Sequence, residues 1–461
     1  MIKVINGTKH GSHPQVSVNI YNALVRSIVE YGSSVTYNAK KTNRQILTVA
    51  TNQCLRKATG CTKSTPINAL AAIAGQDPLE HRLEYITGNS IARSFEQRNV
   101  ISRQLSTVSQ IEEEDADKYS YMENVYNKDK EVYNNIMPIR SIPTTQHVEI
   151  FSSLESVTGP KRNLPPIKLK QAALCVMNGR FKNRGRVFTD ASKHCNTCGI
   201  GIYIEGTARY HYKLANEVSI STAELLAINE AMNVLKDKQL YHYVVYTDSM
   251  TACGMLEEAL HAHKGQAILM EILRTAYEMG TAIQWVTSHV GLGGNEIADQ
   301  LAKLGTSAAA EVMDHQIFYK DAKQQLKNKK HARTQAWYKS YSEEKGKHFY
   351  QIQEEYSDRP WYYGQDLKGY EVRLINRLMT AHNFSKAWLA RMKIVEDPDC
   401  ELCAEPETAE HSIIHCPRFN IERAEFSFDG RYASLVDIFK KKDISLCKEV
   451  VAFVKKCKLD L

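Results

Sequence analysis

The sequence lacks any apolar run long enough to cross a lipid bilayer. Its longest apolar stretches, Ala69–Ala74 and Val450–Val454, are far shorter than the roughly 20 residues that a spanning helix requires. The first residues, MIKVINGTKH, also lack the apolar core of a secretory signal peptide. These absences predict an intracellular protein, in the nucleus or the cytoplasm, that is neither secreted nor inserted in a membrane.

A disulfide framework is not expected either. The 461 residues include 11 cysteines, and in an intracellular chain these are reduced thiols or metal ligands. Cys195 and Cys198 form a C-x2-C pair with no second pair nearby, which predicts free thiols in a turn, and Cys253 is predicted to lie in the core. The length predicts more than one domain.

Positive charge is concentrated in one segment. The formal net charge is +7, and residues 318–350 carry nine Lys or Arg against three acidic residues, a net of +6. Aromatic residues are interleaved with these cations: Tyr319, Trp337, Tyr338, Tyr341 and Phe349. A basic helix with stacking side chains would suit a phosphate backbone or the bases of a single-stranded nucleic acid. The alternative is a solvated helix whose aromatic side chains pack on a neighbour.

Four acidic residues lie in sequence contexts that belong together: Asp190 in VFTDAS, Glu224 in STAELLAI, Asp248 in VVYTDSM and Asp299 in GNEIADQLA. The segment around them has the pattern strand, strand, strand, helix, strand, helix, strand, helix. Asp190 and Asp248 would each end a buried apolar strand. Carboxylates that converge on one cleft repel each other unless hard divalent cations neutralise them. Two such ions about 3.5–4 Å apart can clamp a phosphodiester.

Each carboxylate also has a purely structural interpretation. Glu224 could complete a capping box with Ser221 at the start of an amphipathic helix. Asp248, together with Ser249, could cap the following helix. Asp299, one turn into the last helix, would interact favourably with the helix dipole. The joint pattern favours the metal site over these separate explanations.

In this order, the four contexts resemble type 1 ribonuclease H, and most of all the ribonuclease H domain of LINE-type (non-LTR) retrotransposon reverse-transcriptase proteins. The run QWVTSHVGLGGNEIADQLAKLG, residues 284–305, resembles the last strand, the histidine loop and the last helix of that family. The resemblance implies an α/β fold for residues 183–310, with a ribonuclease H-like five-stranded mixed sheet flanked by helices. It also implies the site residues: two Mg²⁺ ions, or Mn²⁺ in their place, held by Asp190, Glu224, Asp248 and Asp299, with His289 assisting proton transfer or product exit. The alternative to a catalytic role for His289 is that it is simply a solvated histidine in a loop.

The sequence departs from the family in two places. It has TDAS where cellular enzymes usually have TDGS, a change that retroelement members share. The connection HAHKGQ between the two middle helices is short, whereas cellular enzymes of the bacterial type carry a basic protrusion there that grips the hybrid. Affinity for the hybrid would then depend on another part of the chain, and the basic segment 318–350 is a candidate.

Residues 1–110 are predicted to be helical, with prolines opening and glycines ending the helices. Residues 16–95 resemble the segment after the polymerase core of LINE-type proteins, in a LVRSIVEYG-like helix, a helix ending in TG and a G-x-x-PLE-x-R pattern. The Tyr-x-Asp-Asp turn of a polymerase is absent from the sequence, and Asp115 and Asp117 lie in a solvated acidic run. The chain is therefore not expected to polymerise DNA.

Composition and motifs predict the character of the remaining segments. Residues 111–182, rich in acidic residues, tyrosine and proline, are predicted to form a partly disordered and mostly extended linker. Residues 311–395 are predicted as a basic helical region, and residues 396–461 as a C-terminal helical zinc-binding region.

The run CELCAEPETAEHSIIHCPRF predicts a zinc site. Cys400 and Cys403 form a C-x2-C knuckle that tetrahedral Zn²⁺ favours, and His411 and Cys416 would complete a Cys3His set. The spacing resembles the zinc-knuckle-like motif of LINE-type proteins. His415 is the rival fourth ligand, because residues four apart share one face of an α-helix whereas Cys416 is five residues from His411. Tight thiolate binding favours Cys416, and the alternative to any zinc site is a helix with incidental histidines and free thiols.

These patterns predict a metal-dependent endoribonuclease that hydrolyses the RNA strand of RNA–DNA hybrids, in a retrotransposon-derived protein lacking the polymerase core. The rival function is a catalytically weak remnant that binds nucleic acid and zinc. A transposase or integrase of the same fold is disfavoured, since the glutamate lies on the first helix after three strands and two more acidic residues follow it.

Overall fold

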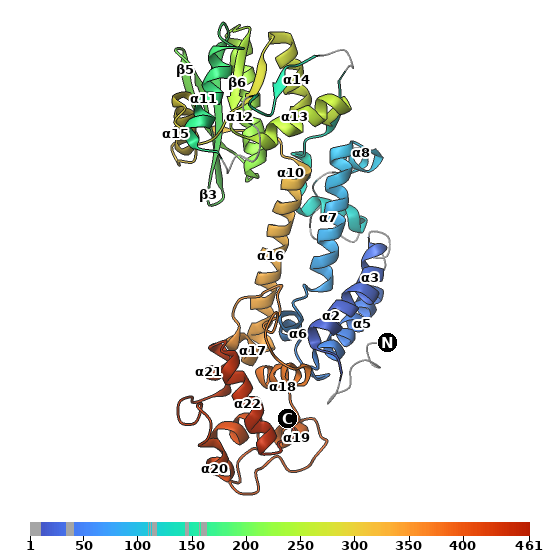
Figure 1. Cartoon of the computed structure of the whole chain (residues 1–461). Coiled ribbons are helices and arrows are strands. Elements are labelled where there is room, and N and C mark those ends of the chain that lie inside the picture. The colour runs from blue at the N-terminus through green and yellow to red at the C-terminus, as the bar shows by residue number, and fades with distance from the viewer. Residues whose placement is uncertain are drawn as a thin grey trace. The chain divides into compact units, whose positions relative to one another are not determined.

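The computed structural model describes residues 11–33, 41–108, 110, 112, 118–142, 147–155, 157 and 164–461. The chain forms two compact units, one of residues 88–327 and the other of residues 1–87 with residues 328–461 (Figure 1). Helices α7 (Leu79–Gln97) and α16 (Tyr319–Glu344) contribute residues to both units. This division differs from the five expected segments, because N-terminal and C-terminal helices share one core.

The unit of residues 88–327 is built on a mixed sheet of seven strands in the order β2-β8-β6-β3-β4-β5-β9. The strands are β2 (Ile150–Phe151), β3 (Gly185–His194), β4 (Thr197–Ile204), β5 (Ala208–Leu214), β6 (Tyr243–Thr247), β8 (Ala282–Trp285) and β9 (Val312–Met313). Strands β3, β4 and β5 form an antiparallel meander, and β6 and β8 extend the sheet in parallel from β3. The five central strands confirm the predicted five-stranded mixed sheet, to which β2 and β9 add short parallel edges.

Helices flank this sheet. The helices wholly within the unit are α8 (Val100–Ser106), α9 (Tyr121–Lys128), α10 (Lys130–Asn134), α11 (Pro166–Asn178), α12 (Ile220–Asp237), α13 (Met250–Ala262), α14 (Ala267–Met279) and α15 (Gly293–Gly305). A separate two-stranded sheet pairs β1 (Ile139–Ser141) with β7 (Lys264–Gln266). Both α12 and α15 pack directly on β3 and β4. The α/β class predicted from the sequence is confirmed.

Two glycines of β4 allow α15 to lie directly against the sheet. A Cβ atom on Gly201 would come within 2.2 Å of the carbonyl oxygen of Ala298, and one on Gly199 within 2.5 Å of that of Ala302. No side chain fits in this space without moving a backbone. The alternation of isoleucine with glycine in GIGIYI therefore sets the position of the helix that carries Asp299.

The expected linker is largely folded where the structure describes it. Helices α9, α10 and α11 lie within residues 111–182, so the prediction of a mostly extended segment was wrong there. Ser120 and Glu123 form a capping box that starts α9, and Tyr126 and Tyr133 are buried against each other and Phe95. The acidic residues 113–117, Asp115 and Asp117 among them, lie outside the described residues.

The prolines of the same segment led to the wrong prediction of an extended chain. Pro165 is the N-cap of α11 and Pro166 is its first residue. At the first turn of a helix the missing N–H costs nothing, because that group has no partner inside the helix. The Pro-Pro pair that predicted an extended chain therefore opens a helix, and the apolar residues behind it, such as Leu169 and Val176, are buried.

The second unit is helical. Its elements are α2 (Pro14–Tyr21), η1 (Asn22–Arg26), α3 (Ser27–Tyr31), α5 (Lys41–Thr59), α6 (Ile67–Ala74), α17 (Lys347–Ile352), α18 (Gly369–Thr380), α19 (Lys386–Arg391), η4 (His411–His415), η5 (Pro417–Phe419), α20 (Asn420–Arg423), α21 (Leu435–Lys440) and α22 (Ile444–Lys456). One hydrophobic core joins α6 with α18 and α22, through residues such as Leu70, Val372 and Phe453. The predicted helical N-terminal region is confirmed. No helix among the described residues is both long and apolar enough to cross a membrane.

Candidate active site and metal cluster

Asp190 and Asp248 are adjacent because of the register between two parallel strands. Thr189 of β3 pairs with Thr247 of β6, so the next residue on each strand is one of the two aspartates. The sequence predicted that Asp190 ends its strand, but β3 continues to His194 and Asp190 pairs with Gly201 of β4. The parallel pairing of β3 with β6 stops at Thr189 and Thr247, and the two carboxylates that follow lie close together.

Glu224 completes a group of three carboxylates. One oxygen from each of Asp190, Glu224 and Asp248 lies within 4.8 Å of the others. The N-cap of α12 is Ser219, not Ser221, so the capping-box explanation of Glu224 is wrong. Glu224 is 6% exposed, and its Oε2 atom is buried with no hydrogen-bond partner among the described residues.

The structural explanation of Asp248 also fails. Ser249 is the N-cap of α13 and its side chain accepts a hydrogen bond from the backbone N–H of Ala252. Asp248 instead accepts a bond from Asn295 Nδ2 at 3.4 Å through Oδ2, and its backbone oxygen accepts one from Trp285 Nε1 at 3.1 Å. Its carboxylate is therefore directed to the acidic group rather than to the helix end.

Burial and mutual repulsion perturb these acids. Desolvation, followed by the charge of Asp248, raises the pKa of Asp190 to about 7. Desolvation and the charges of Asp190 and Asp248 raise the pKa of Glu224 well above its usual range. Ionised carboxylates so close together are costly without a cation, and a hard divalent ion with oxygen ligands is the group that this donor set fits.

These pKa shifts predict how stability varies with pH before metal binds. The folded protein keeps protons on Asp190 and Glu224 that the unfolded chain releases near pH 4, so stability should fall as the pH rises from about 4 to about 7. Asp190→Asn should flatten this dependence and raise stability at pH 8 by about 1 kcal/mol or more. Thermal unfolding at pH 5 and pH 8 without Mg²⁺ measures both effects. Glu278→Gln, which removes a half-exposed carboxylate paired with Lys236, should leave the pH dependence unchanged.

Asp299 and His289 lie outside the closely spaced group. Asp299 is the seventh residue of α15, further from the helix start than predicted, and accepts a bond from Lys303 Nζ at 2.7 Å. Its charge nevertheless acts on Asp190. His289 is exposed in the loop after β8 and has a positive φ of 54°.

Asn295 hydrogen-bonds the Asp248 carboxylate, but it was not among the site residues predicted from the sequence. It is 3% exposed and lies one helical turn before Asp299 on α15, so both can face the carboxylates. The signal was present as the i, i+4 spacing of Asn and Asp in GNEIADQLA.

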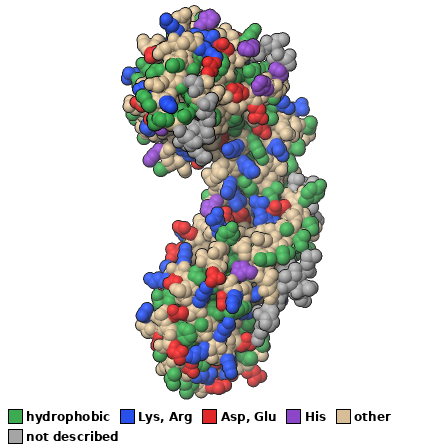
Figure 2. Space-filling model, in the orientation of Figure 1, with side chains coloured by type: hydrophobic (Ala, Val, Ile, Leu, Met, Phe, Trp, Pro, Cys, Tyr) green, Lys and Arg blue, Asp and Glu red, His purple; other side chains and the backbone are tan. Residues whose placement is uncertain are grey.

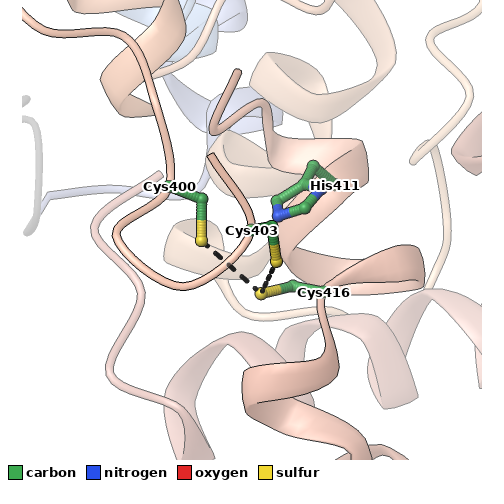
Figure 3. Close-up of side chains that lie close together, drawn as sticks. All are labelled: Cys400, Cys403, His411 and Cys416. Carbon is green, nitrogen blue, oxygen red and sulfur yellow. Dashed lines mark hydrogen bonds between the residues drawn. The ribbon is translucent and has the colours of Figure 1, made fainter. Parts of the chain in front are cut away.

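Cys400, Cys403, His411 and Cys416 form a second group of possible metal ligands, all within 4.8 Å of one another. Figure 3 shows the thiols of the loop residues Cys400 and Cys403 facing Cys416, with the imidazole of His411 beside them. Cys416 Sγ lies 3.8 Å from both other sulfur atoms. With Zn–S bonds of about 2.3 Å, the edge of a tetrahedron would be about 3.8 Å.

A π-helical turn selects the fourth member of this group. Residues 411–415 form the π-helix η4, and the backbone N–H of Cys416 donates to the oxygen of His411 at 2.7 Å. In a π turn residues five apart are bonded, so Cys416 lies beside His411 where an α-helix would have placed His415. His415 is exposed and is not a member of the group.

The surroundings of the cluster also suit a metal. His411 Nδ1 lies 3.4 Å from Glu405 Oε2, and Nε2 is buried with no hydrogen-bond partner among the described residues. A carboxylate behind a ligating histidine is a common arrangement in metal sites. Desolvation works against ionisation of Cys400, but hydrogen bonds from the backbone of Leu402 and Cys403 outweigh it and lower the pKa of this thiol to about 6.

Cys195 and Cys198 are free, as predicted, and Cys195 is exposed at the turn between β3 and β4. Cys198 is not in the turn as predicted, since it lies in β4 and is fully buried. Cys253 is free and fully buried on α13. Within the described residues, none of them belongs to a group of possible metal ligands.

The aromatic residues of the basic segment are used for packing. Tyr338 is 0% exposed and Phe349 1%, and Trp337 packs against the core of the helical unit. Lys330 is also buried and forms an ion pair with Asp77 at 2.5 Å. On the face shown in Figure 2, cationic and anionic side chains are intermixed over the helical unit. These contacts favour the packing interpretation over a stacking platform for bases.

Residues 182–307 match the ribonuclease H family, described as RNase H. Together with the mixed sheet and its flanking helices, this match defines a ribonuclease H domain. The chain is similar over 119 residues to the Pol polyproteins of Equine infectious anemia virus isolates 1369 and CL22, with 30% identity to each. The similarity covers 26% of this chain and 10% of the length of those relatives.

Proposed function

We propose that the protein is a metal-dependent endoribonuclease that hydrolyses the RNA strand of RNA–DNA hybrids. The observation that supports this proposal is the group formed by Asp190, Glu224 and Asp248, with one carboxylate oxygen buried and unpartnered. Carboxylate oxygens gathered in this way are the donors that hard divalent cations prefer. The ribonuclease H domain in which the group lies supports the choice of substrate.

In this proposal Asp190, Glu224 and Asp248 hold two Mg²⁺ ions, with Asp299 beside them. The ions would supply activation of the attacking water and stabilisation of the departing 3′-oxygen. Asn295 orients the Asp248 carboxylate through its side-chain amide. His289, exposed on its loop, exchanges protons with solvent or assists departure of the product. Recognition of the 2′-hydroxyl distinguishes RNA from DNA.

We further propose that Cys400, Cys403, His411 and Cys416 hold one structural Zn²⁺, and that the protein derives from a LINE-type retrotransposon. The closed Cys3His set has no free position for a substrate, which favours a structural role. The helical segment of residues 16–95 and the spacing of the cysteine motif support the retrotransposon origin by their resemblance to that family.

A cleavage assay on three duplexes tests the proposed activity. The full chain should cut the RNA strand of a labelled hybrid in Mg²⁺, leaving 3′-hydroxyl and 5′-phosphate ends, and should leave duplex DNA and duplex RNA intact. Cleavage should stop when Mg²⁺ is omitted. A protein that binds the hybrid but does not cut it under any divalent metal would instead be the catalytically weak binding remnant.

Affinity for the hybrid should depend on a stripe of exposed lysines at the start of α16. Lys320, Lys323 and Lys327 are exposed and share one face of the helix, unlike the paired Lys330. Changing all three to Gln should flatten the slope of log affinity against log salt by up to about 2–3, with little change in the rate at saturating hybrid.

The matched control changes three exposed lysines further along the chain, which removes the same charge: Lys339, Lys345 and Lys347. This triple variant should retain the salt slope of the parent. Equal flattening in both variants would mean that only net charge matters and that the stripe does not contact the hybrid.

A further inference from the structure

A buried aspartate from beyond the ribonuclease H match holds the start of the helix that carries Glu224. Asp321 lies in the first turn of α16 and is 4% exposed. Its Oδ1 accepts a hydrogen bond from the backbone N–H of Ser219 at 2.9 Å, and its Oδ2 accepts one from Thr222 Oγ1 at 2.6 Å. Ser219 is the N-cap of α12 and Thr222 is in its first turn.

The carboxylate is suited to this position for electrostatic reasons. The first N–H groups of a helix have no partner inside the helix, and the N-terminus carries partial positive charge. Asp321 thus satisfies the N-cap N–H of α12 and a hydroxyl in the first turn. The Ser219 side chain makes a long bond of 3.4 Å to the backbone N–H of Thr222 and one of 3.0 Å to its hydroxyl. Asp321 adds two shorter bonds, at 2.9 and 2.6 Å, from a distant part of the chain.

The chain leading into α12 is fixed by neighbouring contacts. Gln325, one turn after Asp321, donates to the backbone oxygen of Glu217 at 2.7 Å. Lys193 Nζ donates to the backbone oxygen of Val218 at 3.0 Å. Ala322 and Leu326, on the same part of α16, are buried. The connection before the helix and the first turn of the helix are thus held by different residues, which allows the two roles to be tested separately.

We propose that Asp321 is a positioning residue for the metal site, acting through α12 to place the carboxylate of Glu224. Glu224 follows Thr222 by two residues, so the first turn of α12 sets the position of its backbone. Its carboxyl group also interacts with Asp190 and with the backbone of Ala191, while its buried Oε2 has no hydrogen-bond partner among the described residues. This inference rests on the proposed function for its metal, and it extends the functional unit past residue 307, where the family match ends.

The test measures metal affinity directly, in the full chain and without substrate. Asp321→Ala should weaken binding of Mn²⁺, followed by calorimetry, by about 10-fold or more, since partners that orient metal ligands contribute about 10–100-fold. In the cleavage assay the same variant should need correspondingly more Mg²⁺. Its rate at saturating metal and its KM for the hybrid should stay within about 2-fold of the parent.

Gln325→Ala is the matched control, because the hydrogen bond that it removes runs from the same helix to the connection before α12 and not to α12 itself. It should lower the melting temperature without changing Mn²⁺ affinity. Equal losses of metal affinity in the two variants, or none in Asp321→Ala, would overturn the proposal and leave Asp321 a purely structural residue.

A double-mutant cycle covers the case in which Asp321→Ala does not fold. Asp321→Asn and Thr222→Val each keep the shape of the side chain and remove or weaken the bond between them. Their effects on Mn²⁺ affinity should be less than additive, and strictly additive effects would count against the proposal. If the parent binds Mn²⁺ but cuts no hybrid, the proposed activity fails while this comparison still decides the role of Asp321.

Discussion

Asp248→Asn is expected to abolish cleavage of an RNA–DNA hybrid. The substitution removes the charge of one proposed metal ligand and preserves its shape. Loss of residues that merely orient ligands costs about 10–100-fold, so loss of a ligand should cost more than about 100-fold in rate. A single-turnover cleavage assay at saturating Mg²⁺ measures this directly.

The same variant should remain folded, so that a loss of cleavage can be attributed to the site and not to unfolding. Three carboxylates lie within 4.8 Å of one another, so removing one charge relieves repulsion in the protein before metal binds. Thermal unfolding without Mg²⁺ should show Asp248→Asn to be as stable as the parent or more stable. Asp237→Asn, a change of an exposed carboxylate at the end of α12, should retain full activity. Parental activity in Asp248→Asn would refute the assignment of the site.

Cys416→Ser is expected to remove zinc from the protein, whereas His415→Ala should keep it. The Cys416 thiol is buried 3.8 Å from each of two others, and His415 is exposed. Structural zinc contributes apparent binding energies of about 10–16 kcal/mol, so losing a ligand should have a large effect. Elemental analysis of the purified chains should give one zinc per chain for the parent and for His415→Ala.

Loss of zinc should also destabilise the helical unit. Ala409 and Ile413, on either side of His411, belong to the hydrophobic core of that unit. Arg423 is buried and donates to the backbone oxygens of Ile413 and Cys416, so the turn is tied to the helices that follow. Chelation should therefore lower the melting temperature of the parent much more than that of Cys416→Ser. Zinc retained by Cys416→Ser and lost from His415→Ala would make His415 the ligand.

The sequence was sufficient to bring Asp190, Glu224 and Asp248 together because local patterns determine their positions. Two apolar strands that each run into an aspartate align when they pair in parallel, and the helix pattern around Glu224 fixes which face it presents. The cysteine spacing was equally informative, since a C-x2-C knuckle needs only a short loop.

What the sequence did not predict depends on contacts between distant residues. Tyr338 and Trp337 look like stacking side chains on a basic helix, but helices that are remote in the chain bury Tyr338 and pack against Trp337. The π turn that selects Cys416 arises from one backbone hydrogen bond that an ideal α-helix would not make. The anchor of α12 comes from Asp321, about 100 residues later, and no local pattern predicts such a pairing.

The two edge strands of the sheet determine which truncated fragments of the protein should stay free of aggregation. Without them, β8 and β5 would expose rows of unpaired N–H and C=O groups, which invite edge-to-edge association and aggregation. Strands β2 and β9 are only two residues each, but they cover these borders, and both lie outside the match of residues 182–307. A fragment trimmed to the family boundaries would therefore be prone to aggregate on expression. A fragment of residues 88–327, the whole compact unit, keeps both edge strands and also β1, the partner of β7, and is the better choice for solution work and crystallisation.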